Sequence, residues 1–516
     1  MSPSRDENRA LTTQHRVTAA DLAVVALSVM IGAYVTARAA TVSITIDEAV
    51  TWFLHVNGGT FDILLLRTPG EPDNNHVLFT LLAKLSVAMF GLSELALRLP
   101  SLLGFVGFMI GANLVLRRIV PGWRQALGVA ALGLNPYLID YFSVARGYGL
   151  ALGFTSLGMA ALLASISGRP EDPRLRSGQA AVLLFALAAL ANLSFLLILL
   201  AGILVLSLLQ FFQRNRPSVS AEQIRSPCRT ALAIALPSMP ILAYLLYPLI
   251  VLGRRNLFSF GGTTGFWHDT VGSLIDGTIH EVPWFVDSRW LLQIWVAATL
   301  LLTAPVLWTL WKLDRRGFIA FAAICGMTLL VATASLVQHE LLNVALLDGR
   351  HALAFIPLFI LWAIASTMAR PAAPRTLTAA TYFVGAVVPA LLCLNGLLAM
   401  NVSYVRDWRF DAGARDIMTA AKSWIDWRRP EAVVRMRSSW ILAPSGNFYR
   451  ATLDLESRLL PLTMEDGPEF STPADLYYVQ GADQAAVAKF GVKPLAWSPV
   501  ADTMLLEQLK DSASWK

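Results

Sequence analysis

Two adjacent carboxylates, Asp47 and Glu48, directly follow the first long apolar run of the sequence, residues 21–42. If that run crosses a membrane, the pair lies at the membrane surface, where partial burial raises carboxylate pKa values. A carboxylate that removes a proton from an acceptor hydroxyl needs such a place, close to lipid and open to water. The pair is therefore a candidate general base. The alternative is a solvated loop or a helix N-terminus, where acids are also favoured.

A second polar cluster lies in the segment 68–76, which reads TPGEPDNNH. Asp73 is a third candidate catalytic acid, and Asn75 and His76 are candidates to support the site. Asp47, Asp73 and His76 are also plausible ligands of a divalent metal, but no spacing rule supports a metal site, so none is favoured. The alternative is a polar turn that caps the following helix at Asn75.

Basic and aromatic side chains further along the chain supply a candidate anion site. The residues that we expect to bind a phosphate group are Arg67, Arg146, Tyr148, Arg350 and His351. Arginine suits phosphate because its planar guanidinium can donate two parallel hydrogen bonds. The alternative is that Arg146 and Arg350 only pair with acids nearby in the sequence, Asp140 and Asp348.

The composition indicates which class of protein presents these residues. The chain has 516 residues, 55% of them hydrophobic and only 15% charged, whereas soluble proteins carry roughly a quarter charged residues. Candidate membrane spans lie at 21–42, 98–118, 125–140, 148–167, 178–191, 194–212, 230–252, 290–311, 317–337, 352–368 and 377–400. We therefore expect an α-helical polytopic membrane protein with about eleven spans. The net charge of +6 is typical of arginine-rich cytoplasmic loops and does not indicate nucleic acid binding.

Arginine and lysine are distributed unequally between alternate loops. The richer set consists of the N-terminal residues 5–16 and the loops around 117–124, 169–176, 214–229, 312–316 and 370–375. Cytoplasmic loops carry such an excess, so we predict an inside N-terminus and an outside C-terminus. The candidate acids and phosphate-binding arginines then lie on the outer side, which in a bacterium is the periplasmic face of the inner membrane.

Two segments contain no span. Val77–Phe90 is apolar but too short to cross, so we predict an interfacial helix within the outer loop 43–97, with Lys84 reaching the lipid headgroups. Residues 401–516 suffice for one small α/β domain outside the membrane, after a membrane domain in residues 1–400. In this C-terminal part we expect strands at 440–443 and 476–479 and helices at 412–427 and 485–490.

Five short motifs occur in order on the predicted outer side. They are the pair Asp47-Glu48, the stretch 73–82 (DNNHVLFTLL), the run 90–101 (FGLSELALRLPS), the triplet 146–148 (RGY) and the segment 349–353 (GRHAL). Together they resemble the GT-C superfamily of membrane glycosyltransferases, and most closely its protein O-mannosyltransferase-like branch, glycosyltransferase family 39, which is similar to the lipid A aminoarabinose transferases. The chain departs from that pattern at Val77, where many relatives have proline.

This resemblance implies a fold, a donor and a set of roles. It implies the GT-C fold and a polyprenyl-phosphate-linked sugar as donor, used at the outer face without a required metal or other cofactor. Asp47 would be the catalytic base, with Glu48 as its neighbour. Arg350, Arg146 and Arg67 would hold the departing phosphate, so that the reaction is a single displacement with inversion. The acceptor stays open between a glycan, a lipid and a protein.

Three other functions compete with this one. A transporter or flippase needs charged residues inside its spans, and the predicted spans are almost free of them. A lipid-linked polymer ligase would share the donor chemistry. A non-catalytic membrane scaffold would bind a partner through its outer domain and would not need the acid pair.

Overall fold

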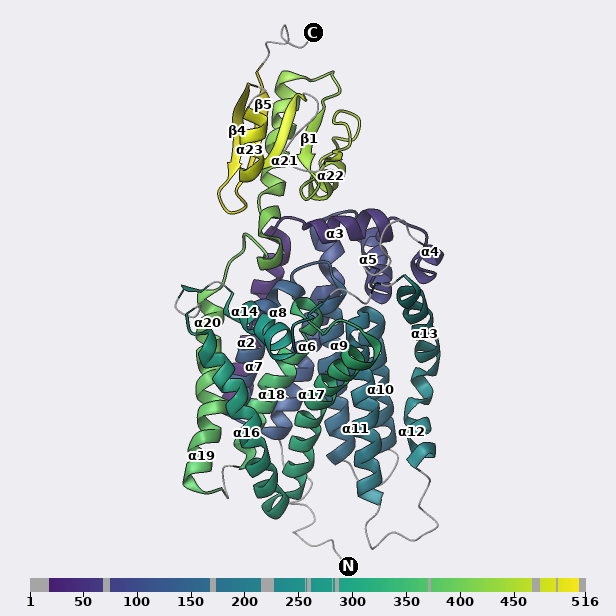
Figure 1. Ribbon diagram of the computed structural model, residues 1–516, viewed down its shortest axis with the longest axis vertical. Coiled ribbons are helices and arrows are strands. Elements are labelled where there is room, and N and C mark those ends of the chain that lie inside the picture. The colour runs from purple at the N-terminus through teal and green to yellow at the C-terminus, as the bar shows by residue number, and fades with distance from the viewer. Residues whose placement is uncertain are drawn as a thin grey trace, which may run out of the picture.

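The structure, a computed structural model, describes residues 18–67, 75–167, 173–214, 227–255, 257, 261–280, 282–283, 287–369, 373–465, 474–488 and 491–509. Long helices run side by side as a bundle, and a small β-sheet stands at one end of it (Figure 1). The short helix α3 (Ile46–Val50), which carries the acid pair, lies at that same end of the bundle (Figure 1).

The helices of the bundle differ in length. The long ones are α2 (Ala19–Thr41), α6 (Glu94–Ile119), α9 (Gly147–Ser167), α16 (Arg289–Leu313) and α17 (Arg315–Leu342). Two further stretches are chains of shorter helices, namely α12 (Pro227–Ala235), η5 (Leu236–Ser238) and α13 (Met239–Arg254), and then α19 (Arg375–Tyr382), η9 (Phe383–Val387) and α20 (Val388–Leu398). Shorter apolar helices are α5 (Val77–Phe90), α10 (Pro173–Ala191), α11 (Leu196–Arg214) and α18 (Phe355–Ala365).

Seven stretches among the described residues are long and apolar enough to cross a membrane, so the chain is a multi-pass membrane protein. The predicted span 125–140 is wrong as a single helix, because the chain breaks there into α7 (Trp123–Gly133) and α8 (Pro136–Phe142). Asn135 accepts a hydrogen bond from the N–H of Leu138 at 3.1 Å, and Pro136 has no N–H to continue the preceding helix. The predicted break near Asn192 is confirmed, since α10 ends at Ala191.

Glycines let α6 and α9 pack in backbone contact. A Cβ added at Gly104 would lie 2.4 Å from the carbonyl oxygen of Gly149, and one at Gly153 would lie 2.3 Å from that of Gly104. Small residues suit helix association in a membrane, where lipid removes most of the hydrophobic driving force. The close contact also brings Ser101 of α6 next to the start of α9, where its hydroxyl donates to the carbonyl oxygen of Arg146 at 3.1 Å.

The helix α5 packs against α6 and α10, and its lysine does not reach outward. Lys84 Nζ donates to the carbonyl oxygens of Val56 (3.0 Å) and Gly58 (2.6 Å) at the end of the π-helix η1 (Thr51–Val56). The C-terminus of a helix favours a cation, so the predicted contact of Lys84 with lipid headgroups is replaced by one with the protein backbone. That α5 lies along the membrane surface stays a prediction.

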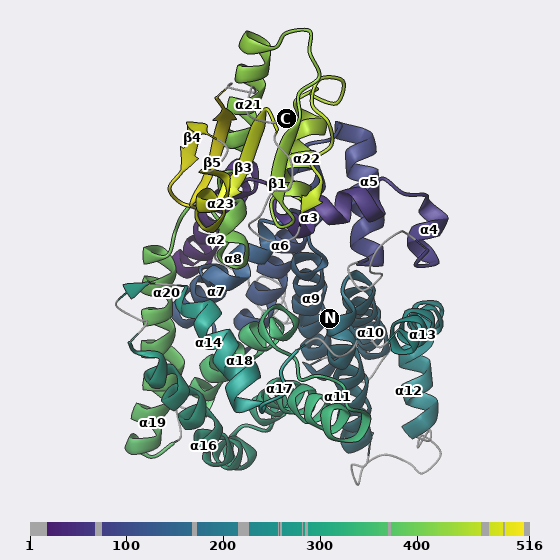
Figure 2. The ribbon, with the colours of Figure 1, turned by 45° about the horizontal axis from the view of Figure 1, so that its top comes forward.

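The C-terminal part contains a five-stranded sheet of order β2-β1-β3-β5-β4 (Figure 2). The strands are β1 (Met436–Ser439), β2 (Met464–Glu465), β3 (Leu476–Gln480), β4 (Val492–Ser498) and β5 (Thr503–Gln508). The β1 strand pairs in parallel with β2 and β3, and the other pairs are antiparallel. The helices beside the sheet are α21 (Ala414–Arg428), α22 (Ala443–Thr452) and α23 (Gln484–Ala488).

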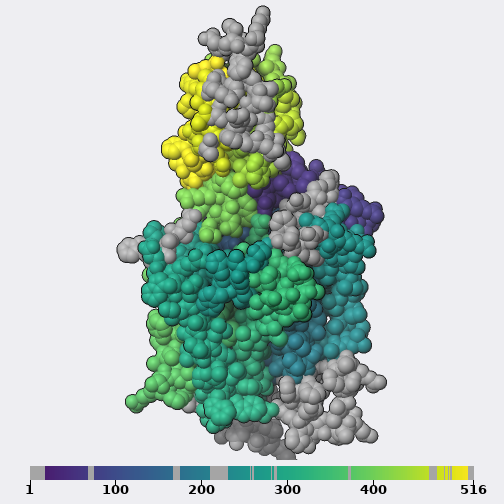
Figure 3. Space-filling view, viewed as in Figure 1, coloured from purple at the N-terminus to yellow at the C-terminus, as the bar shows by residue number. Residues whose placement is uncertain are grey.

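The predictions for this part are confirmed for the strand at 476–479 and the helix at 412–427, and for the helix at 485–490 as far as Ala488. The predicted strand 440–443 is wrong, because Pro444 stands in the first turn of α22, where its fixed φ favours a helix. In a space-filling view the sheet protrudes from the bundle (Figure 3). The domain division at residue 400 and its outer location stay predictions.

Candidate active site

Asp47 stands in the first turn of α3, which begins with a reciprocal cap. Thr45 Oγ1 accepts a hydrogen bond from the N–H of Glu48 (3.3 Å), and Glu48 Oε2 accepts one from the N–H of Thr45 (2.9 Å). The sequence pattern Thr-x-x-Glu specifies this capping box. The cap turns Glu48 back toward the protein and leaves the side chain of Asp47 22% exposed.

Glu48 is fully buried and surrounded by donors. Arg98 of α6 binds both of its carboxylate oxygens, at 2.7 Å through Nε and at 2.8 Å through a terminal nitrogen, and the N–H of Ala145 donates to Oε1. With the bond from Thr45, each carboxylate oxygen accepts two hydrogen bonds. This geometry favours a positioning role for Glu48, which fixes α3 and the loop before Arg146.

Two arginines that are distant in the sequence converge on Asp47. A terminal nitrogen of Arg350 donates to Asp47 Oδ2 at 2.9 Å, and one of Arg146 lies 3.5 Å from the same oxygen. Arg146 is buried and also donates to Thr51 Oγ1 at 3.2 Å. Two cations around one carboxylate leave net positive charge, so this cluster of Asp47, Arg146 and Arg350 can attract an anion.

Arg350 is positioned by a turn and an aromatic ring. It lies in η7 (Gly349–Ala352), where Gly349 has a φ of +48°, a region that favours glycine. The N–H of Gly349 donates to Ser273 Oγ at 2.9 Å, which ties η7 to α14 (Gly272–Ile279). The guanidinium of Arg350 lies 5.6 Å from the ring centroid of Trp408, within the range of a cation–π interaction.

Three histidines near the arginines are neutral at neutral pH. Burial, followed by the charges of Arg350 and Arg146, lowers the pKa of His351 to about 4. Burial and then Arg146 lower the pKa of His55 to about 4, and burial with the same arginines holds the pKa of His76 well below its usual range. The positive charge of the site therefore comes from the arginines.

Tyr148 connects two of these histidines. It is buried at the start of α9, and its ring meets that of His76 edge-on with centroids 5.5 Å apart. The ring centroid of His351 lies 6.3 Å from that of Tyr148. The three side chains thus form one wall beside the arginines.

A cavity of about 420 Å³ opens beside this wall. Its polar lining residues are Asn75, His76, Arg146, Tyr148, Asn192, Ser194, Tyr244, Gln338, Arg350 and His351. The rest of its wall is mostly aliphatic and includes Leu196 and Leu200 of α11, Leu249 of α13 and Leu342 of α17. A cavity with cations among its polar groups and a long apolar wall fits an amphiphile with an anionic head and a hydrocarbon chain.

The remaining predicted residues are Asn75, Arg67 and Asp73. Asn75 donates through Nδ2 to the carbonyl oxygen of Ile63 at 2.9 Å, which fixes the chain before α5. Arg67 is exposed and does not line the cavity. Asp73 lies outside the described residues, and with it the metal site considered for Asp47, Asp73 and His76. Among the side chains that the structure describes, no group of three His, Cys, Asp or Glu residues could hold a metal ion.

The chain is similar in fold to ArnT from Cupriavidus metallidurans in the apo state, with a TM-score of 0.51 and 15% identity over 94% of this chain and 98% of that chain. The chain has the GT-C fold. A structure of the same ArnT bound to undecaprenyl phosphate scores 0.42 at 14% identity over 95% and 98% of the two chains. The Archaeoglobus fulgidus oligosaccharyltransferase in complex with Zn and sulfate scores 0.39 at 10% identity over 93% and 73%. Because the last two TM-scores are below 0.5, the fold assignment rests on the apo ArnT structure alone. No family model and no curated protein matches the sequence.

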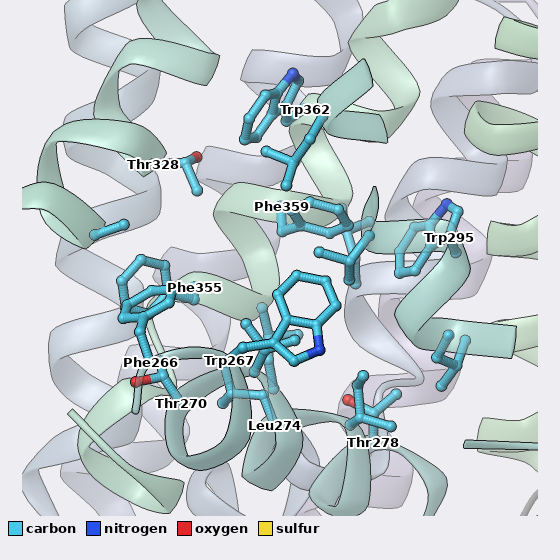
Figure 4. Close-up of a pocket in the computed structure, with 18 of the residues that line it drawn as sticks. Phe266, Trp267, Thr270, Leu274, Thr278, Trp295, Thr328, Phe355, Phe359 and Trp362 are labelled. Carbon is cyan, nitrogen blue, oxygen red and sulfur yellow. The ribbon is translucent and has the colours of Figure 1, made fainter. Parts of the chain in front are cut away.

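The predicted resemblance to the GT-C superfamily is therefore confirmed for the fold. The GT-C bundle also holds a second cavity, of about 270 Å³, between η6 (Trp267–Val271), α14, α16, α17 and α18. Figure 4 shows aromatic rings around it, among them Trp267, Trp295 and Phe359. Its polar lining residues are Asn135 and three threonines, with no charged group. It offers space for hydrocarbon and no acid or base for a reaction.

Three residues that the sequence did not single out contact the elements of this site, namely Arg98, Trp408 and Asp411. Arg98 lies within the motif 90–101, but its pairing with Glu48 depends on the packing of α6 against α3. Trp408 and Asp411 lie in the C-terminal part, about which the sequence said nothing beyond secondary structure. Two aromatic residues and two acids in the run 406–411, just after the last apolar helix, are the only local signal.

Proposed function

We propose that the protein is an inverting glycosyltransferase that moves a sugar from a polyprenyl-phosphate donor to an acceptor hydroxyl at the outer face of the membrane. The supporting observation is the Asp47 carboxylate between Arg146 and Arg350, beside a cavity with a long apolar wall. A carboxylate, fixed cations and room for a lipid chain are the three things that this transfer needs.

In the proposed donor complex the lipid phosphate binds to Arg350 and Arg146. Both guanidiniums face Asp47 Oδ2 in the structure, so a bound phosphate competes with that oxygen for their N–H groups. Arginine forms paired, charge-assisted hydrogen bonds with phosphate oxygens. The polyprenyl chain follows the leucines of α11, α13 and α17 that line the cavity.

The reaction is a single displacement at the anomeric carbon. Asp47 accepts the proton of the acceptor hydroxyl while that oxygen bonds to the anomeric carbon from the face opposite to the phosphate. The bond between the anomeric carbon and the phosphate oxygen breaks, and the lipid phosphate leaves with its electron pair. Arg350 and Arg146 stabilise the negative charge that grows on the leaving phosphate, so the chain itself supplies the base and the cations.

The location follows from the distribution of arginine in the loops. We propose that the site and the C-terminal part lie on the periplasmic side of a bacterial inner membrane. Nucleotide sugars stay in the cytosol, so an enzyme at this face needs a lipid-borne sugar. The proposal leaves the sugar and the acceptor, whether glycan, lipid or protein, to experiment.

The experiment is mass analysis of lipids and glycans of the cell envelope with the gene, without it, and with Asp47→Asn in its place. The proposal expects one glycosylated product to disappear on deletion, to return with the wild-type gene and to stay absent with Asp47→Asn. An unchanged envelope after deletion, together with no transfer by the purified protein from any polyprenyl-phosphate sugar, would favour a transporter or a scaffold.

A further inference from the structure

The C-terminal part reaches into the site through one segment, the 3₁₀-helix η10 (Arg406–Asp411). The chain enters it from α20 past Asn401 and Tyr404, whose carbonyl oxygens accept hydrogen bonds from Arg38 of α2 at 2.7 and 2.6 Å. Arg38 is buried and also pairs with Asp140. The start of the C-terminal part is thus anchored inside the outer end of the bundle.

Trp408 is the residue of η10 that meets the phosphate-binding arginine. Its side chain is buried, with the guanidinium of Arg350 5.6 Å from its ring centroid. Its ring also packs against that of Tyr141, with centroids 5.8 Å apart, and the Tyr141 hydroxyl donates to Asp407 Oδ2 at 2.7 Å. The contact with Tyr141, which is itself bonded to the neighbouring Asp407, holds Trp408 in place, so its ring limits the directions in which Arg350 can point.

Asp411, at the end of η10, meets the helix that carries the proposed base. It is buried, and its Oδ2 accepts a hydrogen bond from the N–H of Ile46 at 2.7 Å. Ile46 is the first residue of α3 and precedes Asp47. The first N–H groups of a helix have no partner within it, so Asp411 supplies one and fixes the start of α3.

Two further hydrogen bonds connect the residues just before α3 to the C-terminal part. Ser43 donates to the carbonyl oxygen of Ala412 at 3.0 Å, and the N–H of Ile44 donates to the hydroxyl of Tyr449 at 2.8 Å. Burial, with the charges of Glu48 and Asp47, raises the pKa of Asp411 well above its usual range. This shift lessens the negative charge that Asp411 adds beside the acid pair while its Oδ2 accepts from Ile46.

We infer that Trp408 and Asp411 are positioning residues of the proposed reaction, supplied by the C-terminal part. Trp408 orients Arg350 toward the donor phosphate, and Asp411 holds α3 so that Asp47 faces the acceptor. The inference rests on the proposed function and assigns the C-terminal part a role in catalysis. Neither residue touches the reacting atoms.

The test measures binding of undecaprenyl phosphate and turnover by the purified full-length protein in nanodiscs. Trp408→Ala should raise Kd by about three- to tenfold, since a buried cation–π contact is lost, and Trp408→Phe should give an intermediate value because phenyl is the weaker partner. The matched control is Trp440→Ala, which removes a tryptophan 51% exposed elsewhere in the C-terminal part.

Asp411 should affect kcat and leave Kd unchanged. Asp411→Ala should lower kcat by about tenfold at an unchanged Kd, because the loss of a helix-start partner loosens Asp47. Asp411→Asn should restore most of kcat, because its amide oxygen can accept the same bond from Ile46. The matched control is Asp416→Ala, on the exposed side of α21.

The outcomes separate this inference from the proposed function. If the wild type binds undecaprenyl phosphate no better than Arg350→Ala does, the proposed function fails. If that difference is present but Trp408→Ala matches Trp440→Ala, or Asp411→Ala turns over like Asp416→Ala, the inference fails alone. Where an alanine variant does not fold, the conservative variant at the same position is measured instead. The inference is overturned if Trp408→Phe has the Kd of the wild type. It is also overturned if the kcat of Asp411→Asn is as low as that of Asp47→Asn.

Discussion

Replacing Asp47 by asparagine isolates the proton acceptor from the rest of the site. Asparagine keeps the size of the side chain and one oxygen that can accept from Arg350, whose nitrogen lies 2.9 Å away. The side chain of Asp47 is 22% exposed and that of Arg350 35% exposed. Exchanging a charge-assisted bond for a neutral one at such a place costs about 1 kcal/mol of folding free energy. Asp47→Asn should therefore fold and insert.

The effect on rate is much larger than the effect on stability. Loss of a general base typically lowers a rate by about 10² to 10⁴, so kcat should fall by that factor. The Kd for undecaprenyl phosphate should stay unchanged or decrease, because the carboxylate no longer competes with phosphate for Arg350 and Arg146. The assay is release of free polyprenyl phosphate from a radiolabelled donor, in parallel with a binding titration, with Asp416→Asn as the control. Near-normal kcat in Asp47→Asn, or a strongly raised Kd, would refute the role given to this carboxylate.

Four further predictions follow from the same geometry. Arg350→Ala should raise the Kd for undecaprenyl phosphate and also lower kcat, each by about tenfold or more, because phosphate is charged before and during the reaction, and Arg350→Lys should recover part of both. Glu48→Gln should lower stability by about 3–5 kcal/mol, seen as a lower unfolding midpoint, because it leaves the buried Arg98 without its counter-ion. The pKa of His351 is about 4 in the folded protein against a usual 6.5. The unfolded chain therefore binds more protons between these pH values, and stability is lost as the pH falls through them; a His351→Gln variant should show a shallower fall of its unfolding midpoint. In a variant without other cysteines, Ser423→Cys should react with an impermeant thiol reagent from the periplasm and Arg316→Cys should not, and the reverse pattern would invert the topology.

The sequence predicted the features that depend on neighbouring residues. Runs of about 20 apolar residues marked most of the helices, and the run 125–140 failed because a local signal, Asn135-Pro136, outweighs hydrophobicity. The Thr-x-x-Glu pattern at Thr45 is a further local signal, because it specifies a capping box. With it, the opposite directions of Asp47 and Glu48 follow from local geometry alone.

The rest of the site depends on contacts between distant parts of the chain. Arg350 meets Asp47 although 303 residues separate them, and only the family resemblance brought both into one prediction. Trp408 and Asp411 belong to a segment with no apolar period and no motif, so no local rule places them beside α3 and η7. Arg67, predicted from the same resemblance, is exposed and does not line the cavity, so its binding of phosphate stays a prediction.

In the proposed function, Arg146 and Arg350 bind a lipid phosphate while the cavity between α11, α13 and α17 takes its chain. A cryo-EM structure of the protein in nanodiscs with added undecaprenyl phosphate would show whether both contacts form. The expected density places the phosphate between the two guanidiniums, with Arg350 drawn from Asp47 and the chain along Leu200 and Leu249. Density for the chain in the aromatic cavity around Trp267, with Arg350 still bound to Asp47, would contradict the proposed function.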